Sequence, residues 1–346
     1  MPSPELIAGL TAALVAGVLA YGFSEVAARS RFVLDPVSDR SNHARPVPRL
    51  GGAAVLMGLG GAATVLGVAD LLTWKGGQLF LVAGLAGTLG LMDDLFGLRP
   101  SWKFAGLVLI AIPAVVMTGP VKAVPLPILG WAEVPPFLGF AIAAFWLLSI
   151  TNVLNFMDGL NGLAGSFVIV ALMALGLLVG EVSFALLAVQ AAILGFLLAN
   201  IFAGRIFLGD SGSLALGMTL GTAPLLASGG GQGFWVLPLV TLPLILDVAL
   251  TLIRRAKRGA RLAEPHREHV YQRVKAAGWS HQASSAAVVG GGLAAAALAW
   301  FFWGEAQARP LAYWASAVVI GFVWATIMLL MLAAKRQTAP FPHGDF

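Results

Sequence analysis

Two adjacent carboxylates, Asp93 and Asp94, follow the uncharged run 79–92 in the stretch GTLGLMDDLFGLRP. Like charges repel, and partial burial raises the pKa of a carboxyl group, so such a pair needs a positive partner. Mg²⁺ can serve, because it takes oxygen ligands and commonly joins one or two carboxylates to substrate phosphates. The pair is therefore a candidate cation site. Two solvated carboxylates at a membrane interface are the alternative.

A third carboxylate, Asp210, lies in the segment FLGDSGS. The flanking glycines, Gly209 and Gly212, would let backbone amides approach an anion closely. GDSG alone is a weak motif, but it becomes informative if Asp210 lies on the same membrane face as the aspartate pair. We then expect Asp210 and Asp93 to share the cation.

Three polar residues recur at intervals of three in NFMDGLNGLAG, namely Asn155, Asp158 and Asn161. On a helix this spacing places them along one side. Asparagine offers both donor and acceptor groups, which suits recognition of a base or an amide. The alternative is a cluster that caps the start of the next helix.

His266 and His269 have the same spacing in EPHREHVYQR. Two histidines could bind zinc, but no third ligand stands at a familiar zinc-protease spacing. Arg267 and Arg273 favour phosphate binding instead. Asp247 lies within an apolar segment and is a functional candidate for that reason. A role in capping or helix packing carries equal weight for it.

The elements that must position these residues are membrane helices. Of 346 residues, 59% are hydrophobic and 11% charged, and the mean hydropathy is +0.88. A soluble domain carries about 25% charged residues. Cysteine is absent, which excludes disulfides and thiolate metal sites. The composition predicts an all-α, polytopic integral membrane protein.

A spanning helix needs about 20 mostly apolar residues, and we expect ten to eleven of them. The N-terminal segment has no basic stretch before it and no clear cleavage site, so it reads as a first membrane helix rather than a signal peptide. The candidate spans are 5–27, 50–72, 78–93, 102–118, 136–152, 163–179, 183–203, 214–228, 234–254, 284–303 and 311–334.

The basic residues predict the orientation. With alternating spans, all of the 21 Lys and Arg residues except Lys75, Lys122 and Arg309 fall on one side. By the positive-inside rule that side is cytoplasmic, so the N-terminus lies outside and the C-terminus inside. Every polar motif above falls on the same face. The run RRAKRGAR then reads as a topology determinant near anionic lipid, not as a nucleic-acid patch.

A transporter would bury polar groups near the bilayer midplane, often at broken helices. Here the polar groups gather on one membrane face, which favours an enzyme at the cytoplasmic face over a multi-span transporter or a scaffold. We expect one transmembrane catalytic domain, 1–335, and a short cytoplasmic tail, 336–346. The active-site loops are 28–49, 93–103, 152–162, 204–213 and 255–283.

Five ordered motifs across roughly residues 35–284 resemble the polyprenyl-phosphate N-acetylhexosamine-1-phosphate transferases. They are DRSNHARPVPRLGG, LMDDLFGLRPSWK, NVLNFMDGLNGLAG, IFLGDSGSLALG and HVYQR. Each motif is modest alone, but their joint order and sidedness are specific.

The resemblance implies roles for individual residues. Asp93 and Asp94 become active-site carboxylates with Lys103 as their basic partner, and Asp210 becomes the principal magnesium ligand. His269 inherits the role of the leading histidine of the last motif, and His266 is a second candidate. The expected substrate-binding residues are Asn155, Asp158, Asn161, His266, Arg267, Arg273, Arg49 and His43.

The chain departs from the family pattern at four positions. Asn161 stands where the family often has Asp, and Gly97 where a polar or acidic residue is frequent. Tyr271 and Gln272 replace later histidines of the last motif. This form resembles the O-antigen-initiating branch more than the peptidoglycan branch.

The expected reaction follows from the resemblance. A sugar-1-phosphate passes from a UDP-N-acetylhexosamine to undecaprenyl phosphate, giving undecaprenyl-diphospho-sugar and UMP. Mg²⁺, with Mn²⁺ as an alternative, would be the cofactor. We expect Asp94 to face Lys103 or the acceptor phosphate, as a base or as a scaffold. The expected location is the bacterial inner membrane; a homodimer is left open, and nucleic acid is not a partner.

Overall fold

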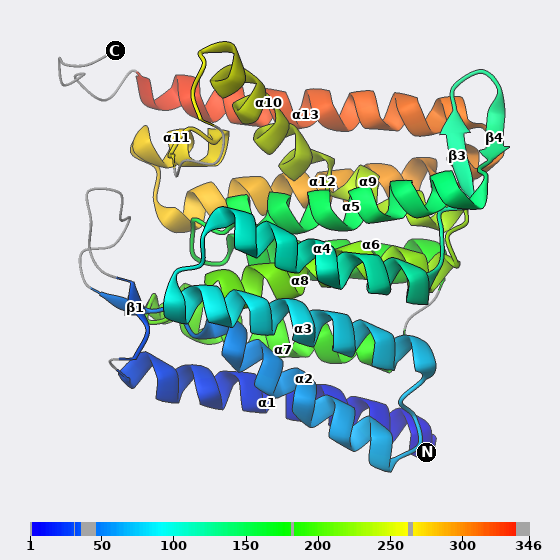
Figure 1. The fold of residues 1–346 in the computed structure, drawn as a ribbon. Helices are drawn as coiled ribbons and strands as arrows, with labels where there is room; N and C mark the ends of the chain where they lie inside the picture. The colour runs from blue at the N-terminus through cyan, green and yellow to red at the C-terminus, as the bar shows by residue number, and fades with distance from the viewer. Residues whose placement is uncertain (1, 31, 36–45, 181–182, 262–265, 337–346) are drawn as a thin grey trace.

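The computed structural model describes residues 2–30, 32–35, 46–180, 183–261 and 266–336. Long helices lie side by side in one bundle (Figure 1). Their bounds are α1 Pro4–Arg29, α2 Gly51–Val68, α3 Trp74–Phe96, α4 Pro100–Thr118, α5 Pro136–Met157, α6 Leu163–Val179, α7 Phe184–Ala203, α8 Gly209–Ser228, α9 Val236–Val240, α10 Leu242–Lys257, α11 Val270–Ala276, α12 His281–Ala308 and α13 Pro310–Arg336. A 3-10 helix, Gln232–Trp235, precedes α9.

Two short antiparallel hairpins complete the described secondary structure. Strands β1 (Leu34–Asp35) and β2 (Val47–Pro48) pair beside the start of α2. Strands β3 (Ala123–Leu126) and β4 (Gly130–Glu133) pair at the opposite end of the bundle (Figure 1). The predicted all-α class is therefore confirmed, since the strands are small additions to the helical bundle.

The helices are those of a multi-span membrane protein. By length and composition, eight described helices could cross a membrane, or up to nine if the bent pair Gln232–Val240 and Leu242–Lys257 forms one span. The remaining expected spans correspond to α6, which has 17 residues, and α8, which is diluted by glycine, serine and threonine. Each of the eleven expected segments thus falls on a described helix or on the bent pair.

Helix α8 lies at the centre of the bundle, and every residue from Ser211 to Leu226 is buried. Small residues allow its neighbours to approach closely. A Cβ at Gly217 would lie 2.6 Å from the Cα of Thr151 on α5, and a Cβ at Gly90 of α3 would lie 2.2 Å from the carbonyl oxygen of Asp210. Close packing of this kind drives helix association in lipid, where the hydrophobic effect between helices is absent.

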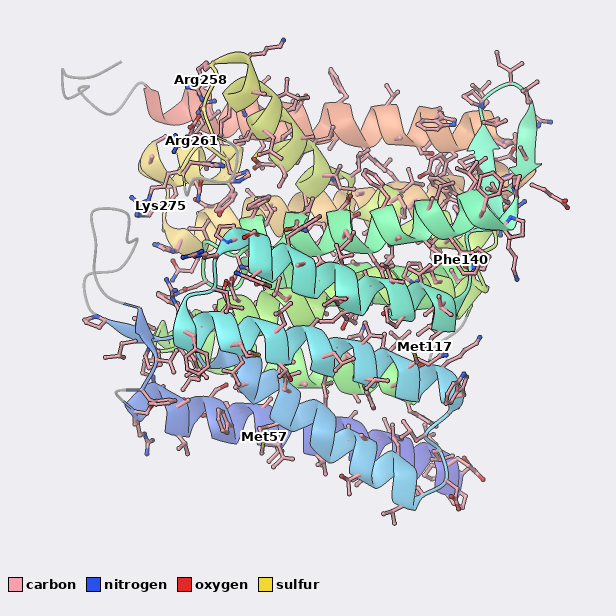
Figure 2. All side chains as sticks on the ribbon, in the orientation of Figure 1. Met57, Met117, Phe140, Arg258, Arg261 and Lys275 are labelled. Carbon is pink, nitrogen blue, oxygen red and sulfur yellow. The ribbon has the colours of Figure 1, made fainter. Side chains whose placement is uncertain are left out.

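The outer surface is apolar. Leu109 on α4 and Phe322 on α13 are each 73% exposed, and Met57 on α2 lies at the bundle surface (Figure 2). Such side chains would be an aggregation hazard in water but match the hydrocarbon of a bilayer. The helices satisfy their own backbone hydrogen bonds, as a lipid-exposed chain requires.

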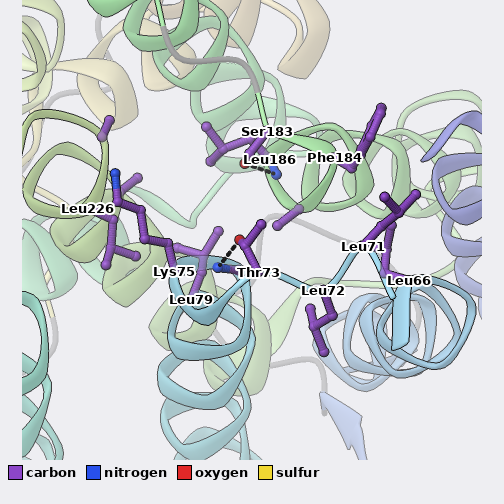
Figure 3. Close-up of a pocket in the computed structure, with 14 residues that line it drawn as sticks. Leu66, Leu71, Leu72, Thr73, Lys75, Leu79, Ser183, Phe184, Leu186 and Leu226 are labelled. Atoms are coloured by element: carbon purple, nitrogen blue, oxygen red, sulfur yellow. Dashed lines mark hydrogen bonds between the residues drawn. The ribbon is translucent and has the colours of Figure 1, made fainter. Parts of the chain in front are cut away.

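The loops that carry the polar motifs meet at one end of the bundle, on the left in Figure 1. The other end holds a largely apolar pocket of about 460 Å³ between the ends of α2, α3, α7 and α8. There Thr73 and Ser183 cap α3 and α7 by accepting hydrogen bonds from Gly76 and Leu186 (Figure 3). Which end faces the cytoplasm stays a prediction.

Candidate active site

The turn between α3 and α4 sets Lys103 beside Asp93. Gly97 ends α3 in the left-handed conformation, with φ +63°, and its amide donates to the Asp93 carbonyl oxygen over 2.8 Å. The Leu98 amide donates to Asp93 Oδ1 over 2.7 Å. Pro100 then starts α4, where its missing N–H costs nothing. Glycine replaces the frequent polar residue at position 97 because the turn needs a positive φ.

Lys103 joins two carboxylates from different helices. Its Nζ lies 2.5 Å from Asp210 Oδ2 and 3.0 Å from Asp93 Oδ2. Asn155 Nδ2 donates to Asp210 Oδ1 over 2.6 Å and to Ser213 Oγ over 2.8 Å. The side chains of Lys103, Asp93 and Asp210 are 18%, 12% and 30% exposed, so these charges interact in a partly dry site. We call these five residues the aspartate cluster.

Asp94 holds the start of α8. Its Oδ1 accepts from the Asp210 amide over 3.0 Å and its Oδ2 from the Ser211 amide over 2.9 Å. A carboxylate at a helix N-terminus satisfies free amides and complements the helix dipole. Gly209 has φ +72°, and a Cβ there would lie 2.8 Å from Asp94 Oδ2. The anion expected beside Gly209 is thus the protein's own Asp94.

The expected contact between Asp94 and Lys103 is wrong. Lys103 pairs with Asp93 and Asp210, whereas both oxygens of Asp94 bind backbone amides. The reason lies in helix geometry. Adjacent residues on a helix point about 100° apart, so Asp93 faces the start of α4 while Asp94 faces α8.

The chain before α2 is fixed to the GDSG segment by backbone hydrogen bonds. Phe207 donates to Pro48, Gly51 donates to Phe207, and Gly52 donates to Leu208, over 2.8, 2.8 and 2.7 Å. Exposed Arg49 lies in this segment and is thereby brought to the site. His43, a predicted substrate-binding residue, lies outside the described residues.

Asn155, Asp158 and Asn161 do not lie along one helix, which corrects the prediction from their spacing. Helix α5 ends at Met157, and Asp158 is its C-cap. Helix α6 is capped at Gly162, whose amide donates to the buried side chain of Asn200 over 2.6 Å. Glycine fits this N-cap because its φ is +79°. The expected capping of α6 by the asparagine–aspartate set is wrong for the same reason.

Asp158 nevertheless faces the same charged region. Burial, followed by the negative charges of Asp210 and Asp94, raises the pKa of Asp158 to about 8, against an opposing effect of Arg49. Asn161 is placed differently. Its carbonyl oxygen accepts from Ser285 Oγ over 2.9 Å, and its side-chain amide lies next to Gly204.

A second polar cluster surrounds His269 and Asp247, both of which are buried. Asp247 Oδ1 lies 3.2 Å from His269 Nδ1 and accepts from the Val270 amide over 2.8 Å. Asp247 Oδ2 accepts from the Tyr271 amide over 3.1 Å. Asp247 therefore caps α11 from α10 and also orients His269, so the two readings of its role apply together.

Ring contacts connect His269 to the aspartate cluster. His269 stacks on Phe156 with ring centroids 6.0 Å apart, and Phe156 is the neighbour of Asn155 in α5. His266 lies 4.9 Å from His269, centroid to centroid. Burial, with the nearby charges of His269 and Arg255, lowers the pKa of His266. The two histidines are thus adjacent, and His269 is the more firmly held.

Arg267 and Arg273 line a separate cleft of about 570 Å³. The other lining residues are Arg254, Lys257, Arg258 and Glu268, and none belongs to the aspartate cluster. The expectation that both arginines hold substrate phosphate stays a prediction.

The donor set fits magnesium. Asp93 and Asp210 converge on one point, marked by Lys103 Nζ, and Mg²⁺ is commonly held by one or two carboxylates plus substrate phosphates. In the described part of the chain, no group of three or more His, Asp or Glu side chains could hold a metal by itself. A site of this kind would be completed by the substrate.

Four residues of the site were not assigned roles from sequence. Ser213 accepts from Asn155, and its place three residues after Asp210 in GDSGS could have marked it. Tyr271 donates to the Phe156 carbonyl oxygen over 3.1 Å, and Gln272 accepts from the His269 amide over 3.2 Å. Of the two substitutions in the histidine motif, Gln272 therefore caps α11, and Tyr271 connects α11 to the end of α5. Asn200 gave no sequence signal.

A helical membrane bundle with such a mixed-charge cluster at one end is typical of an enzyme that acts at a membrane face. The sequence model of glycosyl transferase family 4 matches residues 78–228. This range contains all five residues of the aspartate cluster.

Comparisons with individual proteins agree with the match. The chain is 31% identical to the decaprenyl-phosphate N-acetylglucosaminephosphotransferase of Mycobacterium leprae over 318 residues, which cover 82% of this chain and 80% of the relative. It is 29% identical to a probable undecaprenyl-phosphate N-acetylglucosaminyl 1-phosphate transferase of Bacillus subtilis, covering 72% of each. A phospho-N-acetylmuramoyl-pentapeptide-transferase of Moorella thermoacetica is 33% identical over 50% of this chain and 59% of the relative.

The chain belongs to glycosyl transferase family 4, the polyprenyl-phosphate sugar-phosphate transferases. It is an enzyme of the membrane, and its relatives named above are bacterial.

Proposed function

We propose that the protein transfers N-acetylglucosamine-1-phosphate from UDP-N-acetylglucosamine to undecaprenyl phosphate, giving undecaprenyl-diphospho-N-acetylglucosamine and UMP. The observation that carries the proposal is the convergence of Asp93, Asp210 and Lys103 from three helices at one end of the bundle. The names of the Mycobacterium leprae and Bacillus subtilis relatives favour N-acetylglucosamine over other N-acetylhexosamines. We place the reaction at the cytoplasmic face of the inner membrane, where UDP-sugars are supplied.

The reaction is a displacement at phosphorus. An oxygen of the lipid phosphate attacks the phosphorus that carries the sugar. The bond from that phosphorus to the bridging oxygen breaks, and UMP leaves with the electron pair. The second pKa of a phosphate monoester is about 6, so the acceptor is already largely dianionic at neutral pH and needs no protein base. Catalysis is then mostly positioning and charge neutralisation.

The side chains of the site divide these tasks. Lys103 can donate to phosphate oxygens while it keeps Asp93 and Asp210 apart from bulk water. Asn155 fixes Asp210 by a hydrogen bond, and Asp94 fixes the start of α8 through two amides. These bonds support a positioning role for Asp94 over proton abstraction. His269, held by Asp247, presents its other ring nitrogen for a phosphate or sugar oxygen.

Asp93 and Asp210 would hold Mg²⁺, or Mn²⁺ in its place. The ion would neutralise negative charge on the pyrophosphate and on the departing UMP.

The test uses purified protein with UDP-N-acetylglucosamine, undecaprenyl phosphate and Mg²⁺, followed by UMP release and by mass spectrometry of the lipid product. We expect Asp210→Asn to lose about 100-fold or more in rate. Full activity of Asp210→Asn would contradict the metal assignment. Steady UMP release without lipid phosphate would indicate a hydrolase, and solute uptake into proteoliposomes without UMP would indicate a transporter.

The O-antigen-initiating branch is part of the proposal. It is supported by the HREHVYQR form of the last motif, in which Tyr271 and Gln272 stand in place of histidines. A panel of UDP-sugars in the same assay tests the donor. A preference for UDP-N-acetylmuramoyl-pentapeptide would instead assign the chain to the peptidoglycan branch.

A further inference from the structure

The cleft at the end of α10, which we call the basic cleft, is lined by charges that lie outside the aspartate cluster. Its lining has five cationic side chains and one carboxylate, Glu268. Arg258, one of the five, lies where α10 ends, at the same end of the bundle as the aspartate cluster (Figure 2). The electrostatic potential in such a concave site attracts anions.

Three of the side chains that line the cleft already have partners within the protein. Glu268 forms ion pairs with Arg258 and with Arg255, a buried neighbour of the cleft. Arg254 donates to the Leu250 carbonyl oxygen and to Thr251 Oγ1. The single carboxylate of the cleft is thus neutralised from within the protein.

Three cations are left over. Lys257, Arg267 and Arg273 are exposed, and their side chains make no hydrogen bond or ion pair within the described part of the chain. They come from α10, the segment before α11, and α11, and they line one cleft. Three exposed cations at one concave site produce a positive potential that favours an anionic ligand.

The cleft lies where the sequence of α10 changes from apolar to basic. Leu250 and Ile253, just before Arg254 in α10, are 44% and 51% exposed, as lipid-facing residues are. One helical turn rises about 5.4 Å, so the cations begin within a turn of the hydrocarbon boundary. Lipid phosphates occupy this level, whereas a soluble anion would be spread through the solvent.

We propose that the basic cleft binds the phosphate group of a membrane lipid, at a site separate from the aspartate cluster. Arginine pairs with phosphate through two parallel hydrogen bonds, and each basic residue at a membrane surface strengthens binding about fivefold. The phosphate can come from a polyprenyl phosphate or from an anionic phospholipid. The choice of polyprenyl phosphate rests on the proposed function, whereas binding of a lipid phosphate to the cleft does not.

The test measures lipid binding to the full chain without turnover. Native mass spectrometry of the detergent-solubilised protein follows the titration with undecaprenyl phosphate, phosphatidylglycerol, and uncharged undecaprenol and diacylglycerol. The double variant Lys257→Gln/Arg273→Gln should bind a phosphate lipid roughly 25-fold more weakly, at fivefold for each charge, and the uncharged lipids as before. Arg309→Gln is the matched control, because it removes an exposed cation at the other end of the bundle.

The outcomes separate the sources. Weaker binding of undecaprenyl phosphate alone identifies the acceptor lipid, and weaker binding of both phosphate lipids identifies a general lipid-phosphate site. Unchanged binding of both, or an equal loss in Arg309→Gln, would overturn the proposal.

A second variant keeps the test valid if the double variant fails to fold. Lys257→Gln alone removes one exposed charge and should weaken phosphate-lipid binding about fivefold. Thermal unfolding midpoints and elution volumes show whether each variant is folded. Failure of the transferase assay would leave these binding results unaffected.

Discussion

Lys103 is shared by two carboxylates, because its ammonium group lies 3.0 Å from Asp93 and 2.5 Å from Asp210. One cation for two anions leaves the cluster negative, which suits the metal binding that we propose. In a partly dry environment each of these interactions is stronger than it would be in water. The residues of the cluster therefore depend on one another, and changing one alters the others.

Replacing Lys103 by Met should lower the rate of transfer by about 100-fold, because both carboxylates lose their cation and the phosphates lose a donor. Steady-state kinetics of UMP release measures this. Lys103→Arg should recover part of the rate, since it keeps the charge but changes its geometry. An unaltered rate in Lys103→Met would show that the cluster is only structural.

Asp158 should make stability depend on pH. Its pKa of about 8 in the folded protein exceeds the ordinary value of 3.8, so between these limits the folded state keeps a proton that the unfolded chain has released. The stabilisation is complete below about pH 4 and is lost as pH rises toward 8. In metal-free detergent solution, the free energy of unfolding should fall between pH 5 and 8 more steeply in the wild type than in Asp158→Asn, by about 1.4 kcal/mol per pH unit. Parallel curves would contradict the shift.

At the scale of elements, the site depends on how closely α3 approaches the start of α8. A Cβ at Gly90 would lie 2.2 Å from the Asp210 carbonyl oxygen and 2.5 Å from the Ser211 amide nitrogen. The same crossing lets Asp94 reach both amides. Helix α11 depends in a similar way on Asp247, which reaches it from α10.

Gly90→Ala should push α3 from α8 and lower the transfer rate at least about tenfold, because shifts of an ångström in a positioned site are costly. Gly84→Ala on the same helix is the control, since a Cβ there meets nothing within 4 Å. It should keep the rate and gain up to about 1 kcal/mol of stability from helix propensity. Equal rates in the two variants would mean that the close approach is not needed.

Asp247→Ala should destabilise the protein by about 1–3 kcal/mol, because two buried amides lose their acceptor, and it should also release His269. Thermal unfolding measures the first effect and kcat the second. Asp247→Asn keeps one carbonyl acceptor, so its stability should lie between those of the wild type and Asp247→Ala. If Asp247→Ala unfolds at the wild-type temperature, the cap contributes nothing.

At the scale of the whole molecule, a central buried helix carries Asp210 at one end, and the helices around it expose apolar side chains. All described polar motif loops meet at that end, while the other end holds the apolar pocket. The reaction is thus confined to one membrane face. The charge distribution predicts that this is the cytoplasmic face, and the prediction can be tested directly.

Single cysteines can report the orientation, because the natural chain has none. Arg99→Cys, at the end with the aspartate cluster, should react with a membrane-impermeant maleimide only after the cytoplasmic face is exposed. Arg309→Cys, at the other end, should react in intact cells with a permeabilised outer membrane. Both positions are exposed, so access is limited by the membrane alone. The reverse pattern would invert the topology.

Composition was enough to predict the class, because a chain with 59% hydrophobic residues cannot fold around a single core in water. Motif order and spacing also identified the main site residues, and Asp93, Lys103, Asn155 and Asp210 do converge. The span count was less well determined. Helix α8 is buried by its neighbours rather than by lipid, so its composition does not have to be strongly apolar.

The sequence by itself determined that the protein is a helical membrane enzyme and which residues carry charge at its active end. Only the tertiary structure decided the partners of those charges: Lys103 with Asp93 and Asp210 rather than with Asp94, Asp94 with the amides of α8, and Asp247 with His269. The physical reason is that local spacing fixes which way a side chain points from its own helix. Its partner, however, depends on which helices cross there and how closely, and that is set by packing between segments far apart in the chain.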